Sequence, residues 1–300
     1  MNITLDEVFL ILFVWIDDWH QENIVKASRS GRPVDMSDSE ILTLMLVMDF
    51  IEFESERHYL EFIRSHYLEL FPSLLDHSQY NRRVRALGSM LEELRERLCL
   101  ELEINKENNF ILDTTPVVAV GYKRDKSHSD FAGSADYGYC AARQLHYFGY
   151  KLVMLVSLDG IPGPIELVPA NTDERACADE LLDKIPQGSN VLGDKGFVGK
   201  DWQEGWRKQG INLITFKRKN QIDQPDIETN KILSAVRERI EGVYKLLKTA
   251  GQSIEHTYAH TIEGLCTRVV TKITSLVAKL FLRKKWGIDI LTFKQHLVEI

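Results

Sequence analysis

The pattern of apolar residues changes near Glu107, and this change divides the 300-residue chain into two parts. Before it, apolar residues recur at helical spacing, so we expect residues 1–105 to be all helical. After it, short apolar runs alternate with amphipathic segments, which is typical of a mixed α/β domain. We therefore predict a helical domain at 1–105 and an α/β domain with a C-terminal helix at 106–300.

The second part contains several candidate strands and helices. The expected strands are 109–118, 150–158, 164–170, 190–194 and 211–216, and the expected helices are 173–182, 200–210, 237–248 and 262–282. Asp159-Gly160 predicts a hairpin turn between the second and third strands. Residues 121–149 are predicted to form a long loop, and long loops are often functional.

Three acidic residues stand at positions where a site could form. Asp113 lies in the first strand, Asp194 ends a later strand, and Glu241 lies on a following helix. The carboxyl ends of strands in α/β sheets are where sites assemble, so these acids could meet. Carboxylate oxygens suit Mg²⁺ or Mn²⁺, and two such ions about 3.5–4 Å apart can promote phosphodiester cleavage. Taken singly, Asp113 and Asp194 could cap the next turn or helix.

The segment 237–248 is predicted to form a helix with an apolar stripe of Ile240, Val243 and Leu247. Arg237, Glu241 and Lys248 fall within about 40° of one another around that helix, so one acid stands between two bases. A surface ion pair between Arg237 and Glu241 would give the same pattern. Because Asp113 and Asp194 lie upstream, we favour a metal site that includes Glu241 over a simple ion pair.

A short basic segment near residue 80 is a candidate DNA-binding helix. Ser78 could cap a helix that buries Tyr80, Val84 and Leu87. Its exposed face would carry Gln79, Asn81, Arg82, Arg83 and Arg85. Such residues at the start of a helix can contact base edges in the major groove. A solvated basic face would look the same.

Composition narrows the class of protein. With 44% hydrophobic and 27% charged residues, the chain resembles ordinary globular proteins. The apolar run 8–16 is too short to span a bilayer and lacks the features of a signal peptide, so we expect a buried helix. Four widely spaced cysteines argue against zinc and for a reducing cytoplasm. The net charge of −7 counts against nucleic-acid binding, although local charge matters more.

Several motifs together resemble a known family. The first-acid segment is Leu112-Asp113-Thr114-Thr115-Pro116, and the second-acid segment runs from Leu192 through Asp194-Lys195-Gly196 to Gly199. With Arg237-x₃-Glu241-x₆-Lys248, residues 107–250 resemble the catalytic domain of DDE transposases of bacterial insertion sequences. Ser234 stands where the family's Tyr-Arg-Glu-Lys signature has tyrosine. The N-terminal helices are similar to the DNA-binding region of a group that keeps only the Arg-Ile-Glu core.

The resemblance implies an RNase H-like mixed sheet flanked by helices, preceded by a helical DNA-binding domain. It also implies cleavage at insertion-sequence ends and transfer of the freed 3′-OH to target DNA. Asp113, Asp194 and Glu241 would hold two Mg²⁺ or Mn²⁺ ions. Arg237 and Lys248 would contact phosphates or orient Glu241. Further candidate contacts to the DNA backbone are Lys195, Lys217, Arg218 and Lys219.

The implied partners are double-stranded DNA, as terminal inverted repeats and target, and further copies of the chain in a homodimer or higher assembly. The expected location is the bacterial cytoplasm, on the nucleoid when DNA is bound, with no membrane association. Two alternatives remain open. One is a domesticated DNA-binding protein that has lost transposition, and the other is a nuclease of the same fold without strand transfer.

Overall fold

The computed structural model describes residues 3–23, 35–51, 53, 55–124, 126–216, 227–249, 253–255, 258–288 and 290. The chain forms two compact units. The helical unit comprises Met1–Leu98, Ala250–Ser253 and Glu263–Ile300, and the sheet unit comprises Cys99–Thr249 and Ile254–Ile262. The domain boundary predicted at residue 105 stays a prediction. The last long helix, which begins at residue 262, lies almost entirely in the same compact unit as the N-terminal helices.

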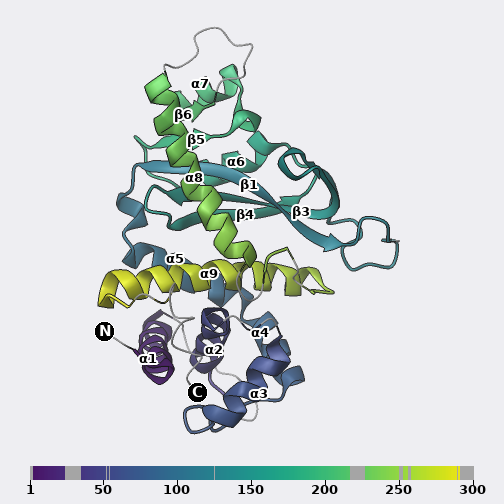
Figure 1. Ribbon diagram of the computed structural model, residues 1–300, viewed down its shortest axis with the longest axis vertical. Coiled ribbons are helices and arrows are strands. Elements are labelled where there is room, and N and C mark those ends of the chain that lie inside the picture. The colour runs from purple at the N-terminus through teal and green to yellow at the C-terminus, as the bar shows by residue number, and fades with distance from the viewer. Residues whose placement is uncertain are drawn as a thin grey trace. The chain divides into compact units, whose positions relative to one another are not determined.

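The helical unit is built from helices at both ends of the chain (Figure 1). They are α1 (Leu5–Asn23), α2 (Asp38–Phe50), α3 (Glu56–His66), α4 (His77–Ala86), the start of α5 (Gly88–Glu101) and α9 (Ile262–Trp286). The all-helical prediction for 1–105 is confirmed within the part of that segment that the structure describes. A capping box starts α2, since Ser37 accepts from the Glu40 amide and Glu40 accepts from the Ser37 amide.

The apolar run 8–16 lies in α1 and is helical as expected. Phe9, Leu12 and Ile16 are buried, whereas Leu10 and Val14 on the other side are exposed. This amphipathic burial explains the run as packing surface of the helical unit. Across the described residues, no helix combines the length and apolar character needed to cross a membrane.

Two buried lysines attach α9 to α2. Lys279 Nζ lies 3.4 Å from Asp49 Oδ2, and Lys272 Nζ also contacts the Asp49 carboxylate. The Ser275 hydroxyl donates to the Leu46 carbonyl at 3.2 Å. Because all these groups are buried, the polar contacts fix how the two helices pack.

The sheet unit contains a mixed six-stranded sheet. Its strands are β1 (Asn109–Val120), β2 (Asp136–Cys140), β3 (Leu145–Ser157), β4 (Pro162–Pro169), β5 (Asn190–Gly193) and β6 (Asn212–Thr215). Their order is β2-β3-β1-β5-β6, and β4 also pairs with β3. The pairs β1–β3, β2–β3 and β3–β4 are antiparallel, whereas β1–β5 and β5–β6 are parallel. The predicted mixed α/β class is confirmed.

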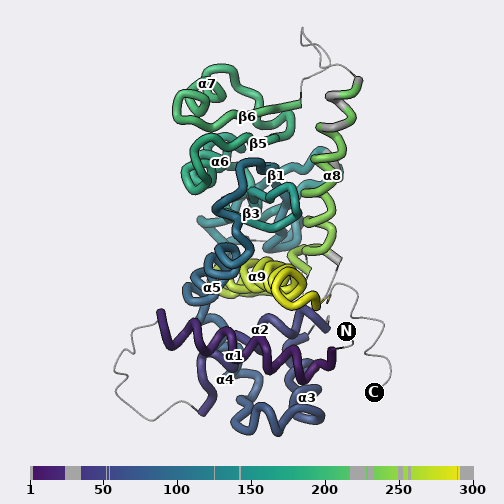
Figure 2. The backbone as a smooth tube through the Cα atoms, turned by 90° about the vertical axis from the view of Figure 1, so that its left-hand side faces the viewer, coloured from purple at the N-terminus to yellow at the C-terminus, as the bar shows by residue number. Residues whose placement is uncertain are grey.

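Helices cover both faces of this sheet. Figure 2 shows α8 (Ile227–Thr249) on one side and α6 (Glu174–Leu182) and α7 (Lys200–Lys208) on the other. Phe110 and Leu112 of β1 belong to the same buried cluster as Leu181 of α6. Because strand side chains alternate between faces, Asp113 lies on the α8 side. The sheet therefore places one candidate acid beneath the helix that carries another.

Two local predictions are corrected by the structure. The segment 121–149, expected as a loop, contains β2 and the start of β3. The strand β2 is short, exposed on alternate residues and interrupted by Gly138, so its pattern resembles a loop. The cap of α4 is Asp76 rather than Ser78, because Asp76 forms a capping box with Gln79 and the helix begins at His77.

Candidate functional site

Asp113 and Asp194 follow the ends of the same parallel pairing. The last paired residues of β1 and β5 are Leu112 and Gly193. The next residue on each strand is one of the two acids, and neighbouring strands lie about 4.8 Å apart. Beyond this point β5 turns into a short 3₁₀ helix, Lys195–Phe197, whereas β1 continues beside β3. The sheet thus brings together two acids that are 81 positions apart in sequence.

The environment of Asp113 disfavours a negative charge. The pKa of its carboxyl is raised to about 7, chiefly by burial and in smaller part by the nearby Asp194 and Glu174. The Thr114 amide, which donates to Asp113 Oδ1 at 2.8 Å, and the Arg237 guanidinium act in the opposite direction. A carboxyl with this pKa holds its proton for half the time at neutral pH. A cation bound beside Asp113, Asp194 and Glu174 would relieve the repulsion among their negative charges.

Glu174 is a third acid at this edge, and the sequence prediction missed it. It is the first residue of α6, directly after the capping Asp173. The Thr114 hydroxyl donates to Glu174 Oε1 at 3.3 Å. Burial raises the pKa of Glu174, Lys151 lowers it, and Asp194 raises it. Its position at a helix start beside the sheet edge was a signal in the sequence.

The glycine of the Asp-Lys-Gly motif, Gly196, lies where a side chain would not fit. A Cβ atom at residue 196 would overlap Glu174 Oε2 and would approach Asp194 Oδ1 to 3.1 Å. The Gly196 amide also donates to Asp194 Oδ1. The glycine therefore lets the backbone hold one acid while a second acid passes directly over it.

Tyr244 anchors α8 on β1 at the candidate site. Its hydroxyl donates to the Asp113 carbonyl oxygen at 2.7 Å, and its side chain is buried. The expected apolar stripe is also buried, in the form of Ile240, Val243 and Leu247. Glu241 lies three residues before Tyr244, about 4.5 Å along the helix axis and about 60° around it. Tyr244 was not among the predicted site residues, although its spacing from Glu241 places both on one side of α8.

Glu241 itself is turned toward Arg237. Glu241 Oε1 lies 3.1 Å from Arg237 Nε, and the two side chains are 56% and 39% exposed. The Arg237 guanidinium also lies over the Phe216 ring, 5.8 Å from its centroid. In the part of the chain that the structure describes, no three acid, histidine or cysteine side chains form a metal-sized cluster. Asp113 is within electrostatic reach of Asp194, Glu174 and Arg237, whereas Glu241 is held in an exposed ion pair with Arg237.

Comparison with known proteins identifies the family. A family model described as "Transposase DDE domain" matches residues 105–262, which is more than half of the chain. The chain belongs to the DDE transposase family. The predicted recognition is therefore confirmed for the family. No curated protein matches the chain.

Among solved structures, several transposases match the chain, all at low sequence identity and low TM-score. One is a piggyBac transposase in a synaptic complex with hairpin DNA (12% identity, 76% of this chain and 51% of that chain covered, TM-score 0.37). Another is Mos1 transposase in a paired-end complex with the left transposon end (12% identity, 80% and 88% covered, TM-score 0.25). A third is the Mos1 mariner paired-end complex with Mn (14% identity, 78% and 82% covered, TM-score 0.23). The chain spans about half the length of the piggyBac transposase.

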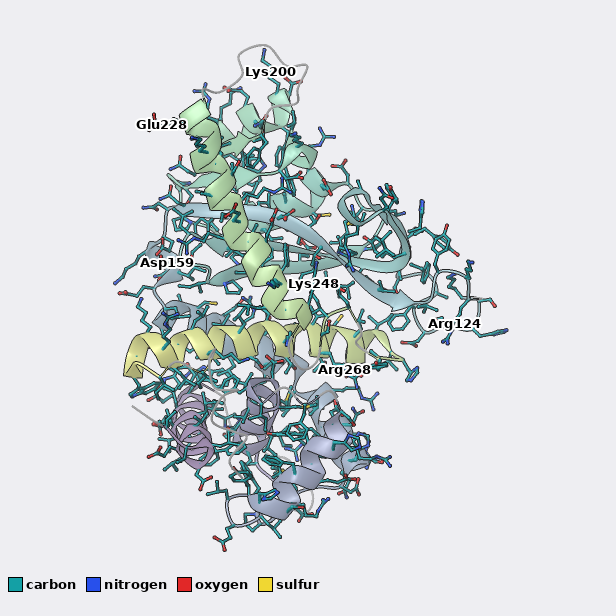
Figure 3. The ribbon with its side chains drawn as sticks, viewed as in Figure 1. Arg124, Asp159, Lys200, Glu228, Lys248 and Arg268 are labelled. Carbon is teal, nitrogen blue, oxygen red and sulfur yellow. The ribbon has the colours of Figure 1, made fainter. Side chains whose placement is uncertain are left out.

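The other basic candidates of the DDE domain are placed differently. Lys248, marked on α8 in Figure 3, lies 3.6 Å from Glu255 and over the Tyr244 ring. Lys195 is exposed directly after Asp194. Lys217, Arg218 and Lys219 lie outside the described residues. Lys195 is therefore the described lysine adjacent to a candidate acid in sequence.

The candidate base-reading residues of α4 mostly have partners inside the helical unit. Gln79 completes the capping box with Asp76. Asn81 Nδ2 donates to Glu56 at 2.8 Å, and Arg83 pairs with Asp38 at 2.6 Å. Arg82 is exposed. Reading of bases by α4 remains a prediction, and Asn81 and Arg83 would have to exchange these partners for DNA.

Proposed function

We propose that this transposase cleaves DNA at insertion-sequence ends and joins the freed 3′-OH to target DNA, using Mg²⁺ or Mn²⁺ held by Asp113, Asp194 and Glu241. The observation that carries the proposal is that Asp113 and Asp194 each directly follow the last pair of the parallel strands β1 and β5. The raised pKa of Asp113 supports it, because burial, Asp194 and Glu174 together outweigh the opposing effects of the Thr114 amide and Arg237.

The residues fit divalent metal ions in their chemistry. All three proposed ligands offer hard carboxylate oxygens, which Mg²⁺ and Mn²⁺ prefer. Two bound ions would supply an activated nucleophile and would stabilise the leaving oxygen. Glu241 has to leave Arg237 to join them, and exposed i,i+4 ion pairs contribute only about 0.3–0.5 kcal/mol. That loss is small beside the free energy of metal binding.

The chain's own contacts would hold the ligands in place. The Thr114 amide orients the Asp113 carboxylate, and the Gly196 amide orients that of Asp194. Once Glu241 turns away, the Arg237 guanidinium becomes free to bind a phosphate in a two-point contact. Lys195 would contact the DNA backbone beside the acids, and Lys217, Arg218 and Lys219 remain candidate backbone contacts from sequence.

We extend the proposal to the partners. Double-stranded DNA would be bound as terminal repeats and as target, with Gln79, Asn81, Arg82 and Arg83 of α4 offering base contacts and Lys248 a phosphate contact. A homodimer or larger assembly would hold two ends together. The chain would act in the bacterial cytoplasm, where four free cysteines remain reduced.

The test is cleavage of a duplex that carries the terminal inverted repeat, with Mg²⁺ or Mn²⁺ added. The wild type should nick the strand at the repeat end, and Asp194→Asn should lower the rate at least about hundredfold, because a metal ligand is lost. Asp201→Asn is the matched control, since Asp201 is an exposed acid at the start of α7. Binding without nicking by the wild type would contradict the proposal and favour a DNA-binding protein. Nicking without joining would indicate a nuclease.

A further inference from the structure

Five rings gather on one end of the sheet, outside the site described above. We call Tyr122, Tyr137, Tyr139, His146 and Phe148 the aromatic ladder. Tyr137 is paired across the strands with Phe148, and Tyr139 with His146. Their ring centroids lie 5.0 Å and 4.5 Å apart, and Tyr122 lies 5.6 Å from Tyr137 and 5.8 Å from His146.

Most of the ladder faces solvent. Tyr122, Tyr137 and Tyr139 are 47%, 50% and 55% exposed. Gly138, between the last two, faces the opposite and packed side, where a Cβ atom would meet Tyr147 and Ala170 at 2.8 Å. Alternation along β2 therefore sends two large rings outward from an edge strand. Contiguous exposed aromatic surface of this kind marks a binding site more often than a packing surface.

Cations accompany the rings. Lys126 Nζ lies 5.7, 5.1 and 5.5 Å from the ring centroids of Tyr122, Tyr137 and Phe148. Lys123 and Arg124 are exposed in the same loop, and Figure 3 shows Arg124 at its outer end. Rings and positive charge in one patch match a ligand that has both flat faces and negative charge.

The ladder lies on the same sheet face as Asp113. Asp113 pairs directly with Met154 of β3, so their side chains share a face. Phe148 and His146 precede Met154 by six and eight residues, and even spacing keeps them on that face. At about 3.3 Å per residue, Phe148 lies roughly 20 Å from Met154 along the strand. The rings and Asp113 therefore lie on one sheet face, and the buried side chains of Tyr150 and Leu152 separate them.

We propose that the aromatic ladder binds unpaired bases of the DNA strand next to the reacting end, by stacking. The proposal rests on the proposed function, because it assigns part of that DNA to a second surface. Aromatic rings stack on any base, so binding would depend on strand pairing rather than on sequence. Lys123, Arg124 and Lys126 would contact the phosphates of the same strand.

The experiment compares a fluorescein-labelled single strand with a duplex of the same sequence, by anisotropy. Tyr139→Ala should weaken single-strand binding roughly fivefold to hundredfold and should change duplex binding less than twofold, since only an unpaired base offers its face. Tyr139→Phe, which keeps the ring, should bind like the wild type. The slope of affinity against salt concentration should not change in Tyr139→Ala, because no phosphate contact is lost. Tyr258→Ala is the matched control, as Tyr258 is 75% exposed and lies outside the ladder.

Equal weakening of single-strand and duplex binding would overturn the proposal, and so would equal weakening by Tyr258→Ala. A change of oligomeric state in Tyr139→Ala, measured by light scattering without loss of single-strand binding, would reassign the rings to contact between copies. The nicking assay on the wild type separates the two proposals. If the wild type nicks DNA but Tyr139→Ala binds single strands normally, only the stacking proposal is wrong. If Tyr139→Ala weakens single-strand binding but the wild type does not nick, only the proposed function is wrong.

Discussion

The carboxyl group of Asp113 is protonated in the folded chain over a pH range where it would be ionised in the unfolded chain. Its pKa is about 7 when folded, against an ordinary value near 4. The folded state therefore binds more protons between about pH 4 and pH 7, so the stability that depends on this group falls as pH rises through that range. Without metal, the stability that this group contributes at low pH should therefore be lost once the pH has risen above about 7.

Asp113→Asn should therefore stabilise the metal-free protein more at pH 8 than at pH 5. The amide resembles the protonated acid and carries no charge at either pH. We expect a gain of about 1–3 kcal/mol at pH 8, measured by urea unfolding in the presence of a chelator. Asp201→Asn should show no such difference, and an equal change at both pH values for Asp113→Asn would contradict the raised pKa.

Gly196→Ala tests whether residue 196 must lack a side chain so that the Glu174 carboxylate can keep its position. The new methyl group would displace the Glu174 carboxylate, which sits at the end of a flexible side chain, so stability should change by less than about 1 kcal/mol. Nicking should fall to the level of Glu174→Ala, and the double variant should be no slower than either single one. Losses that multiply in the double variant would show that Gly196 acts through Asp194 instead.

At the scale of elements, α8 is the link between the two strand acids and Glu241. Its buried stripe packs on the sheet, but the hydroxyl of Tyr244 is the polar contact that fixes α8 against β1 at Asp113. A helix held by apolar side chains alone could slide or rotate by a fraction of a turn. One directional bond at the level of Asp113 removes that freedom.

Tyr244→Phe should lower stability by about 0.5–1.5 kcal/mol, as expected for one hydrogen bond. The larger effect should be on metal use, because Glu241 loses its fixed position. We expect the Mn²⁺ concentration that gives half-maximal nicking to rise about tenfold to a hundredfold. Tyr150→Phe removes the bond to Ser134 in the same unit and is the control. An unchanged Mn²⁺ requirement would show that Tyr244 serves stability alone.

Most elements of the sheet unit could be predicted from sequence, because their apolar periods are regular and Gly or Pro bounds them. β2 was missed because Asp136–Cys140 is a half-exposed edge strand whose stability comes from pairing with β3. The first residue of α4 was also misplaced, since Ser78 and Asp76 are both acceptable caps and only Asp76 has a partner three residues on.

In the candidate site, too, features that depend on neighbouring residues could be predicted, whereas contacts between distant residues could not. The proximity of Asp113 and Asp194 could be predicted, because an acid within one strand and an acid at the end of another are local features of the sequence. For Glu174 and Tyr244 the sequence shows only a helix start and a spacing from Glu241, because the contacts that matter, with Thr114 and with the Asp113 carbonyl, are made 60 and 131 positions away. Periodicity indicates which face of an element is buried and gives no information about what covers it.

At the scale of the whole molecule, the helical unit depends on α9, which reaches it only after the entire sheet unit. Asp49 of α2 lies between Lys272 and Lys279 of α9, and all three side chains are buried. Removing one partner from such a cluster leaves charges with neither water nor a counter-ion, which typically costs several kcal/mol.

Asp49→Ala should accordingly lower the free energy of unfolding of the helical unit by about 3–5 kcal/mol, measured by urea unfolding. Glu103→Ala, which breaks the exposed pair with Lys106 in the sheet unit, should cost less than about 1 kcal/mol. A loss below about 1 kcal/mol for Asp49→Ala would mean that apolar packing alone holds α9.

The order of synthesis gives this arrangement a further consequence. The first helices of the helical unit leave the ribosome with the face that α9 later covers still open to water. About 165 residues (263 − 98) separate them from α9, which at about 5–20 residues per second is a delay of roughly 8–33 s. The sheet unit can fold during that delay, whereas α2 waits with its apolar surface and Asp49 uncovered. The nascent chain should therefore be most prone to aggregation, and most dependent on chaperones, just before α9 emerges.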